Sequence, residues 1–355
     1  MRLMFVISTL ERSGPVNVLY DMCKEFILLG HVVKVITLAA EGGRTRINDF
    51  EELGVIVKCV ASSRIKSLVI GKLSLKKEIA RFDPDVINLH GFRSYILGSG
   101  IPYTVATLHN TIWDDFSQTY SFLQAKLMTY FEVKALKRLS RVVACSESCA
   151  REVNAKYQLN ADFIRNGVDQ SVYYPLTREQ KQKRKEEMFG SAKAVMIFTG
   201  GCSARKRTKN LINVFQIQKL YKKYDLHILG KGDQFEECQK LAVKDVYLDG
   251  YVNNVVRHLQ VADIYISLSS TEGFPMSVLE ALSCGLGVIL SDIPSHREIY
   301  SLFPDRVKII GESSSLIEIL QNFHIPNDND LKCLNAISSK TMCRNYLKIF
   351  HDLYL

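Results

Sequence analysis

Short apolar runs alternate with longer amphipathic stretches along most of the chain. The runs in the first half are LMFVIS (3–8), HVVKVITL (31–38), GVIVKCV (54–60), DVINLH (85–90), YTVATLH (103–109) and RVVACS (141–146), which have the apolar character of buried strands. The segments between them have helical length and spacing, and the first of these closes at Gly30, a typical residue just past a helix end. Apolar strands that alternate with helices predict a parallel sheet covered on both faces.

The alternation stops in the connector RNGVDQSVYYPL (165–176) and then begins again. Five further strands are expected at 194–200, 225–230, 246–250, 263–269 and 287–292, with helices between them. We therefore predict an α/β protein with two doubly wound, Rossmann-like domains. The domains are residues 1–168 and 169–335, and residues 336–355 form a C-terminal helix that packs back toward the first domain. Functional residues are expected on the loops after the strands, where open parallel sheets bind their ligands.

Length and composition only slightly narrow the range of possible ligands and cell compartments. The 355 residues are enough for two cores, and a net charge of +9 suits an anionic ligand, nucleic acid or an acidic membrane surface. Nine scattered cysteines lack metal-type spacing, so buried free thiols in a reducing cytoplasm are expected. No apolar run is long enough to span a membrane, and the opening MRLMFVISTL is interpreted as a strand and not a signal peptide.

Two glutamates flank a turn in the run SLSSTEGFPMSVLEALSCGLGVILSD (267–292). Glu272 is expected in the loop after a strand, and Glu280 in the helix that begins near Pro275. The free N–H groups at a helix start bind phosphate, and carboxylates accept hydrogen bonds from sugar hydroxyls. The run therefore suits a nucleotide sugar. On spacing alone, the alternative is equally good: Glu272 favours the helix dipole and Glu280 lies on a solvated helix face.

Two more strand-to-helix loops carry candidate residues. GGCSARKRTKNL contains Arg205, Lys206, Arg207 and Lys209, and such cations stabilise the charge that builds on a leaving phosphate. The alternative is a solvated basic turn. In ERSGPVN, Gly14 allows the backbone to approach a ligand closely, although a plain turn explains it too.

Histidines at strand ends are the remaining candidates. His109 ends the strand in ATLHN, where a ring nitrogen can bind a sugar hydroxyl, and His90 is a weaker candidate at a similar place. Asp83 and Asp85 precede a strand and are expected to form a turn, not a metal site. GKGDQF has Phe235 where a dinucleotide-binding loop needs its third glycine, which argues against a dehydrogenase.

Residues 272–299 resemble the donor-site signature of the retaining GT-B glycosyltransferases of family 4, also called glycosyl transferases group 1. The segments IRNGVD (164–169), HILGKGD (227–233) and YLDGYVNNV (247–255) resemble further motifs of that family, in the expected order. The resemblance implies a GT-B fold, with two Rossmann-like domains that face each other across a cleft. It also implies transfer of a sugar from a UDP- or GDP-sugar to an acceptor hydroxyl, with retention of configuration. The implied acceptor is a lipid-linked saccharide in the synthesis of a cell-surface polysaccharide such as lipopolysaccharide or capsule.

The resemblance also implies roles for single residues. Glu280 would hold the ribose hydroxyls, and Glu272 would contact the transferred sugar together with His109. Lys206 would bind the diphosphate, and Arg205 would replace the arginine that is common in the family at the position of Gly201. The remaining donor-binding residues would be Gly14, despite Pro15 in place of a second glycine, and the backbone amides of Gly273, Phe274, Met276 and Ser277. No metal or other cofactor is expected, because basic side chains and helix dipoles supply the positive field.

A basic helix raises the question of membrane contact. QAKLMTYFEVKALKRLSR (124–141) either rests on an anionic bilayer or packs on the core with a solvated basic face. We expect a cytoplasmic protein, with peripheral contact at the inner face of the cell membrane.

Two functions remain as alternatives to a glycosyltransferase. They are a nucleotide-sugar epimerase of the same fold and an inactive nucleotide-sugar-binding subunit. Nucleic-acid binding is not expected, because no basic motif with interleaved aromatic residues is present.

Overall fold

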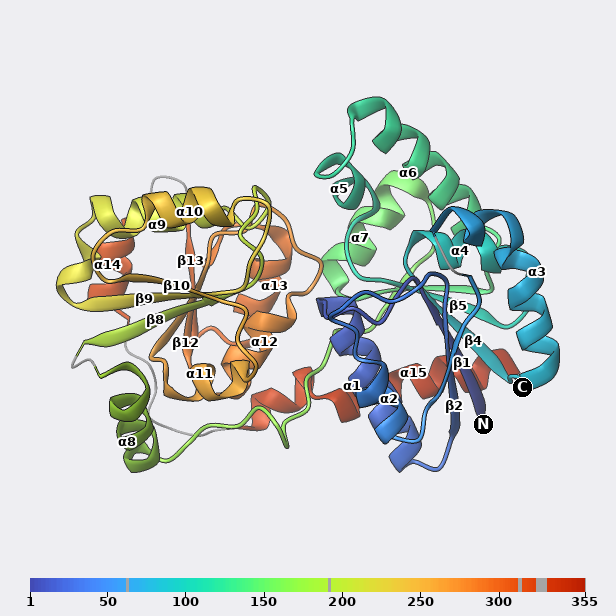
Figure 1. Ribbon diagram of the computed structural model, residues 1–355, viewed down its shortest axis with the longest axis horizontal. Coiled ribbons are helices and arrows are strands. Elements are labelled where there is room, and N and C mark those ends of the chain that lie inside the picture. The colour runs from blue at the N-terminus through green and yellow to red at the C-terminus, as the bar shows by residue number, and fades with distance from the viewer. Residues whose placement is uncertain (62–63, 191–192, 312–314, 324–330, 355) are drawn as a thin grey trace. The chain divides into compact units, whose positions relative to one another are not determined.

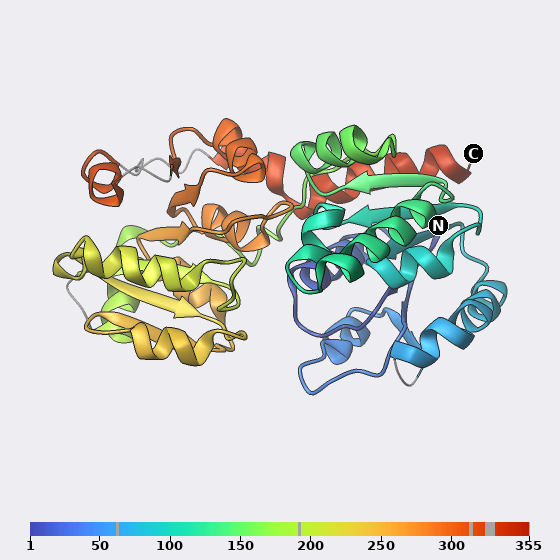
Figure 2. The ribbon, with the colours of Figure 1, turned by 90° about the horizontal axis from the view of Figure 1, so that it is seen from above.

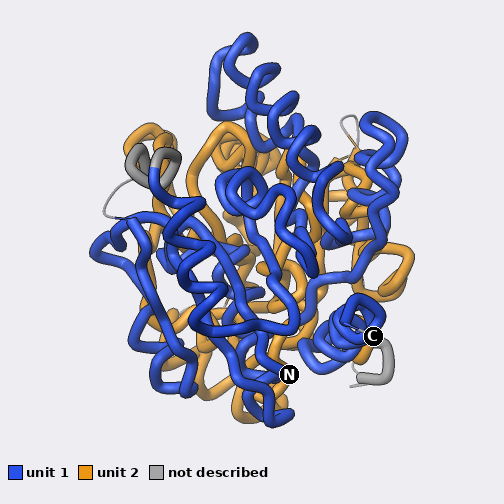
Figure 3. The backbone as a smooth tube through the Cα atoms, turned by 90° about the vertical axis from the view of Figure 1, so that its right-hand side faces the viewer, with its two compact units in different colours: residues 1–167, 337–355 blue, residues 168–336 orange. Residues whose placement is uncertain are grey.

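The chain divides into two compact units in the computed structural model, which describes residues 1–61, 64–190, 193–311, 315–323 and 331–354. Unit 1 comprises Met1–Gly167 and Ile337–Leu355, and unit 2 comprises Val168–Ala336 (Figure 3). The division lies inside the connector in which the strand–helix alternation pauses. Each unit has its own parallel sheet and its own buried core.

Unit 1 is built on a parallel sheet with the strand order β3-β2-β1-β4-β5-β6-β7 (Figure 1). The strands are β1 (Arg2–Ile7), β2 (Val32–Thr37), β3 (Ile56–Cys59), β4 (Val86–His90), β5 (Thr104–Leu108), β6 (Arg141–Ala144) and β7 (Asp162–Phe163). The helices between them are α1 (Gly14–Leu28), α2 (Ile47–Glu52), α3 (Arg64–Phe82), α4 (Phe92–Gly98), α5 (Ile112–Ser117), α6 (Phe122–Leu136) and α7 (Glu147–Tyr157). The central strands β4 and β5 are buried along their whole length, as the apolar runs predict.

The C-terminal helix α15 (Ser339–Tyr354) returns to unit 1 and packs on α1. The hydroxyl of Ser339 donates a 3.0 Å hydrogen bond to the buried carboxylate of Glu25 in α1. Farther along α15, the hydroxyl of Tyr346 lies 3.1 Å from Oγ1 of Thr107 in β5. These buried polar contacts, together with apolar packing, fasten the last helix to the first sheet.

Unit 2 repeats the architecture with the strand order β10-β9-β8-β11-β12-β13. Its strands are β8 (Ala194–Thr199), β9 (Tyr224–Leu229), β10 (Val246–Gly250), β11 (Ile264–Ser267), β12 (Gly287–Ser291) and β13 (Val307–Ile310). Its helices are α8 (Arg178–Phe189), α9 (Thr208–Ile217), α10 (Phe235–Leu241), α11 (Val255–Val261), α12 (Met276–Ser283), α13 (Pro294–Leu302) and α14 (Leu316–Gln321), with 3₁₀ turns at Leu220–Lys222 and Leu331–Ile337. Figures 1 and 2 show α9 and α10 on one face of this sheet and α11 and α12 on the other.

The parallel α/β architecture predicted from the alternating pattern is confirmed in both units. The eight cysteines whose side chains the structure describes are free, and all of them but Cys59 are buried. Among the described helices, none combines the length and the apolar character that crossing a membrane requires.

Candidate functional site

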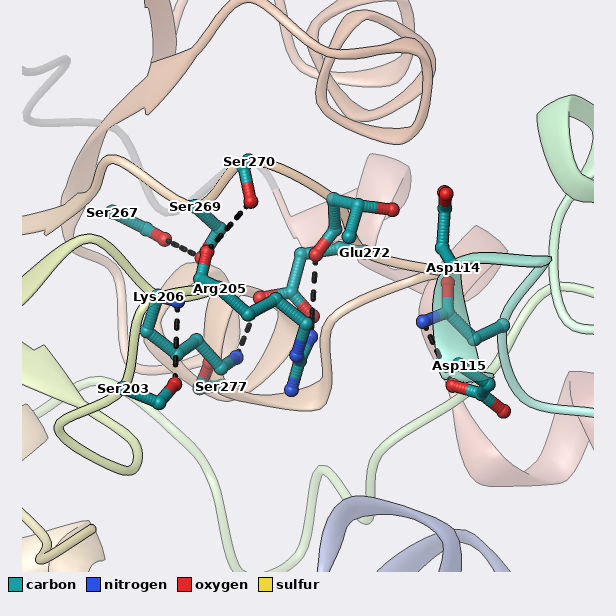
Figure 4. A network of polar contacts seen from close by, with 12 residues as sticks. Asp114, Asp115, Ser203, Arg205, Lys206, Ser267, Ser269, Ser270, Glu272 and Ser277 are labelled. Carbon is teal, nitrogen blue, oxygen red and sulfur yellow. Dashed lines mark hydrogen bonds and ion pairs between the residues drawn. The ribbon is translucent and has the colours of Figure 1, made fainter. Parts of the chain in front are cut away.

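Glu272 is the centre of an ion cluster at the carboxyl end of the unit 2 sheet. It follows β11, and two cations from the loop after the neighbouring strand β8 reach its carboxylate (Figure 4). Lys206 Nζ lies 2.5 Å from Oε1, and Arg205 Nη1 lies 2.9 Å from Oε2. The side chain of Glu272 is only 8% exposed, so its carboxylate is shielded from water, whereas the side chain of Arg205 is 33% exposed.

The charges around Glu272 keep it ionised. Burial alone would raise the pKa of this carboxyl, but Lys206 and Arg205 outweigh burial and lower the pKa to about 2. The cluster therefore holds one permanent carboxylate and two cations. Chemically, the carboxylate can accept hydrogen bonds from hydroxyl groups, and the cations can bind a diphosphate.

The loops that carry these charges are tied together by backbone contacts. Arg205 Nη1 also donates to the carbonyl oxygen of Thr271 at 3.2 Å. In return, the amide of Ser270 donates to the carbonyl of Arg205 at 2.8 Å, and the Ser270 hydroxyl does so at 3.1 Å. The positions of Arg205 and Glu272 are thus coupled independently of their charges.

The four basic residues that follow β8, three in the loop and Lys209 in α9, do not share one site. Arg205 and Lys206 reach Glu272, whereas Lys209 pairs with Glu237 at 2.6 Å. Arg207 directly precedes α9 in a left-handed conformation, with φ 49°. The predicted basic cluster therefore splits into one pair at the site and two residues with other surroundings.

Close packing of two loops explains the glycine at position 201. A Cβ atom added to Gly201 would lie 3.1 Å from the carbonyl oxygen of Lys231, in the loop after β9. One added to Gly230 would lie 2.2 Å from the carbonyl oxygen of Gly200. The loops after β8 and β9 thus meet backbone to backbone, which leaves little room for an arginine at 201. Arg205 is one of the two cations beside Glu272, and its replacement of the family's arginine stays a prediction.

The helix α12 begins directly after the Gly-Phe-Pro turn. The sequence indicates Pro275 as an early helical residue, but Pro275 is the N-cap, with the extended backbone angles φ −69° and ψ 115°. Gly273, Phe274 and Met276 are buried, and Ser277 Oγ accepts a 2.8 Å hydrogen bond from a buried tyrosine hydroxyl. Binding of a diphosphate by the amides of these four residues stays a prediction.

Glu280 lies in the middle of α12 and has no cation beside it among the described contacts. Its side chain is buried, so the alternative of a solvated helix face is wrong. Burial raises the pKa of this carboxyl to about 7, although a hydrogen bond from Tyr173 in the connector lowers it in part. The sequence analysis missed Tyr173, since nothing in its spacing links it to Glu280. The ribose-binding role of Glu280 stays a prediction.

In unit 1, the two strand-end histidines contact each other. His109 Nε2 lies 2.8 Å from His90 Nδ1, and the rings stack with their centroids 5.1 Å apart. Burial lowers the pKa of His109 to about 4 and that of His90 well below its ordinary value. Both rings are therefore neutral at neutral pH and share one N–H between them. His90, the weaker candidate, is thus the direct partner of His109.

The other candidates in unit 1 have simpler surroundings. Gly14 is the exposed first residue of α1, and a Cβ atom there would meet nothing within 4 Å. Pro15 occupies the first turn of the same helix. Asp85 accepts a 2.7 Å hydrogen bond from the amide of Arg2 in β1, and Asp83 has a left-handed backbone with φ 45°. Within the part of the chain that the structure describes, no three acidic, histidine or cysteine side chains are grouped as a metal site requires.

The sequence profiles of two glycosyltransferase families match the two halves of the chain. The profile "Glycosyltransferase Family 4" matches residues 12–172, and "Glycosyl transferases group 1" matches residues 179–323. The second match includes both glutamates and both cations of the site. Together the profiles extend over most of the chain.

Several curated proteins and solved structures are similar to this chain over most of their own length. The O-antigen biosynthesis glycosyltransferase WclY from Escherichia coli is 22% identical over 100% of this chain and 99% of its own. The UDP-Gal:alpha-D-GlcNAc-diphosphoundecaprenol alpha-1,3-galactosyltransferase from Escherichia coli is 25% identical over 79% of this chain and 74% of its own. Among solved structures, Anabaena Alr3699/HepE in complex with UDP-glucose superimposes with a TM-score of 0.80 at 17% identity, over 99% of this chain and 100% of the other. At that identity the structural likeness shows the fold alone. Because both family profiles match the chain and its two Rossmann-like units have this fold, the chain belongs to the GT-B glycosyltransferases of group 1 and family 4.

Proposed function

We propose that the protein transfers a sugar from a UDP- or GDP-sugar to the hydroxyl of a lipid-linked saccharide, as a step in the synthesis of a cell-surface polysaccharide. The observation that carries the proposal is the ion cluster of the buried Glu272 with Lys206 and Arg205, just before the start of α12. It combines cations for a diphosphate with a carboxylate for sugar hydroxyls. The names of the relatives support the substrates, since one acts in O-antigen biosynthesis and another uses UDP-Gal and a diphosphoundecaprenol-linked sugar.

The proposed reaction keeps the configuration at the anomeric carbon. The bond between that carbon and the leaving phosphate oxygen breaks, and the acceptor oxygen forms the new bond on the same face. The leaving phosphate takes the proton of the acceptor hydroxyl. Lys206 and Arg205 stabilise the negative charge that builds on the phosphate, and Glu272 stays ionised beside the transferred sugar. Two side-chain cations serve in place of a metal ion, so the reaction is metal-independent in this proposal.

The experiment that tests the proposal is a transfer assay with UDP- and GDP-sugars and a lipid-linked saccharide, with EDTA present. We expect transfer from one donor class, with the product in the donor's anomeric configuration by NMR. Absence of transfer from every donor contradicts the function, and loss on chelation contradicts the metal-free mechanism. Conversion of the donor without an acceptor indicates an epimerase, and donor binding without any turnover indicates a binding subunit.

Lys206→Met and Lys209→Met form a matched pair for this assay. Both lysines belong to the loop and helix that follow β8, and both are ion-paired with a glutamate, at 2.5 Å to Glu272 and 2.6 Å to Glu237. Because only the first pair belongs to the proposed site, Lys206→Met should lower transfer at least tenfold. Lys209→Met should transfer at the wild-type rate. Equal losses in both variants would indicate a general effect of the mutations on the loop.

The helix α6 supports peripheral contact with an anionic membrane. Its buried residues are Ala125, Thr129, Glu132, Ala135 and Leu136, whereas Leu123, Leu127 and Tyr130 are 77%, 57% and 59% exposed. Exposed basic residues accompany them on and after the helix, namely Lys126, Lys134, Lys137, Arg138 and Arg141. Exposed apolar and basic side chains on one helix suit the interface of an anionic bilayer, where a lipid-linked acceptor resides.

Vesicle sedimentation tests this contact. The protein should sediment with vesicles that contain phosphatidylglycerol and remain in solution with phosphatidylcholine alone. Leu127→Glu should abolish sedimentation, whereas Ile217→Glu, at a 78% exposed apolar residue of unit 2, should leave it unchanged. Equal binding of Leu127→Glu and the wild type would exclude α6 as the contact.

A further inference from the structure

A set of buried polar side chains connects the start of α13 to Glu272. His296 Nδ1 lies 2.9 Å from the carbonyl oxygen of Ser291, and Ser291 Oγ lies 2.6 Å from the carbonyl oxygen of Ser269. Ser267 Oγ lies 3.0 Å from Ser269 Oγ (Figure 4), and the Ser269 side chain is hydrogen-bonded to the carboxylate of Glu272. Ser269 and His296 are completely buried, and the other two serines are less than a tenth exposed. These contacts use side chains that the proposed reaction does not.

The chemistry of the groups fixes the direction of each hydrogen bond. An ionised carboxylate only accepts, so the hydroxyl proton of Ser269 points to Glu272. Ser267 must then donate to Ser269 Oγ, whose own proton is already used. Carbonyl oxygens also only accept, so Ser291 donates to the backbone of Ser269, and His296 donates from Nδ1 to the backbone of Ser291. Every proton in the set is thus assigned, and the bonds converge on Ser269 and, through it, on Glu272.

We propose that Ser267, Ser269, Ser291 and His296 form a positioning network that holds the carboxylate of Glu272 in place during sugar transfer. The inference rests on the proposed function. A bound diphosphate attracts Lys206 and Arg205, which are the two ion-pair partners of Glu272. As those contacts weaken, the hydrogen bond from Ser269 becomes the one that keeps the carboxylate oriented toward the sugar.

His296 fits this role as a neutral donor. Burial lowers the pKa of His296 to about 4, so Nδ1 carries the single ring proton and Nε2 is an acceptor. Nε2 has no hydrogen-bond partner among the described residues. The network therefore needs only the Nδ1 side of the ring. An asparagine amide nitrogen can take the place of Nδ1, whereas a glutamine amide reaches the place of Nε2.

A double-mutant cycle between Ser269 and Glu272 tests the network. Ser269→Ala should lower kcat by roughly tenfold or more, the effect of losing a hydrogen bond to a charged group, with a smaller change in KM for the donor. In the Glu272→Ala background, Ser269→Ala should change the residual rate less than about twofold, because the partner is gone. Equal losses in both backgrounds would overturn the proposal, since a merely structural serine has additive effects.

Variants at the far end of the network provide the second comparison. His296→Asn should retain most of the wild-type kcat, and His296→Gln should lose as much as Ser269→Ala. Similar rates for the two variants would contradict the role of Nδ1. If the His296 variants do not fold, Ser267→Ala at the edge of the network replaces them, with an expected loss smaller than that of Ser269→Ala.

Failure of this inference is distinguishable from failure of the proposed function. If the wild type transfers no sugar at all, the same cycle is measured on the free energy of unfolding in urea. A coupling energy between Ser269 and Glu272 in that cycle still shows that the network holds the carboxylate, whereas additive effects of the two mutations overturn the proposal.

Discussion

Glu280 links the stability of unit 2 to pH. Burial raises the pKa of its carboxyl from the ordinary value of 4.5 to about 7, so the folded state binds the proton more tightly than the unfolded state. The stability from this group is complete below pH 4.5 and is lost as the pH rises through 7. The difference between the two pKa values corresponds to roughly 3 kcal/mol in the free energy of unfolding.

Glu280→Gln isolates this effect. Glutamine has nearly the same shape, keeps an oxygen that accepts the hydrogen bond of Tyr173, and cannot ionise. Below pH 4.5 the variant and the wild type should have similar free energies of unfolding. At about pH 8 the variant should be more stable by roughly 3 kcal/mol, because only the wild type bears the cost of a buried charge.

Urea unfolding followed by circular dichroism over a pH series measures this difference. Glu237→Gln is the control, because Glu237 is exposed and its ion pair with Lys209 lowers the pKa of its carboxyl. Glu237→Gln should therefore show no gain in stability at high pH. Identical pH dependence of Glu280→Gln and the wild type would refute the reasoning, because it would mean that Glu280 ionises in the folded state at no cost.

The same residue links pH to donor binding under the proposed function. Ribose hydroxyls donate to the ionised carboxylate, so nucleotide binding near pH 7 should release a proton from Glu280. Calorimetry in two buffers of different ionisation enthalpy measures that proton. Glu280→Gln should bind without the release, and Glu280→Ala should bind the nucleotide more weakly than the wild type. Unchanged affinity of Glu280→Ala would contradict the ribose role.

Two further substitutions test the ion cluster and the last helix. Lys206→Met leaves one cation beside the buried Glu272, so the free energy of unfolding, measured in urea, should fall by roughly 3 kcal/mol. Lys209→Met should leave it nearly unchanged, because the Lys209–Glu237 pair is exposed to water. Tyr346→Phe removes the 3.1 Å hydrogen bond to Thr107, so the free energy of unfolding in urea should fall by about 1 kcal/mol. The amides of α15 should also exchange their hydrogens faster than in the wild type, and unchanged exchange would show that apolar packing alone holds the helix.

The sequence predicts the interior strands well and misses one edge strand of each sheet. Each predicted apolar run contains a strand. The interior strands are apolar because they are buried on both faces, whereas the predicted edge strands β3 and β10 are partly exposed. The two unpredicted strands, β7 (Asp162–Phe163) and β13 (Val307–Ile310), are the last in their sheets. β7 has two exposed residues, and β13 carries two partly exposed ones, so neither presents the continuous apolar run that identifies a buried strand.

The site residues were predicted in part because parallel sheets place loops in a regular way. Glu272 and Lys206 were both expected after strands, but their contact depends on β8 and β11 being neighbours, which sequence order does not reveal. The burial of Glu280 was not predictable from helical spacing, because seven of the eight residues of α12 are buried and the helix has no solvated face to recognise. Its partner Tyr173 comes from the connector, far away in sequence.

The two glutamates differ in charge because their neighbours differ. Both are buried, and burial alone would raise both pKa values; two cations reverse that effect at Glu272, and none lies beside Glu280. The cluster of Glu272 with Lys206 and Arg205 has a net charge of +1, which attracts an anion such as a diphosphate. A second permanent carboxylate, at Glu280, would cancel that charge, whereas a carboxyl with a pKa of about 7 is only about half ionised at neutral pH and ionises further when hydroxyl donors stabilise its charged form. Under the proposed function, the spacing of the two glutamates suits a nucleotide sugar, and the weaker average charge of Glu280 preserves the positive charge that would attract the diphosphate.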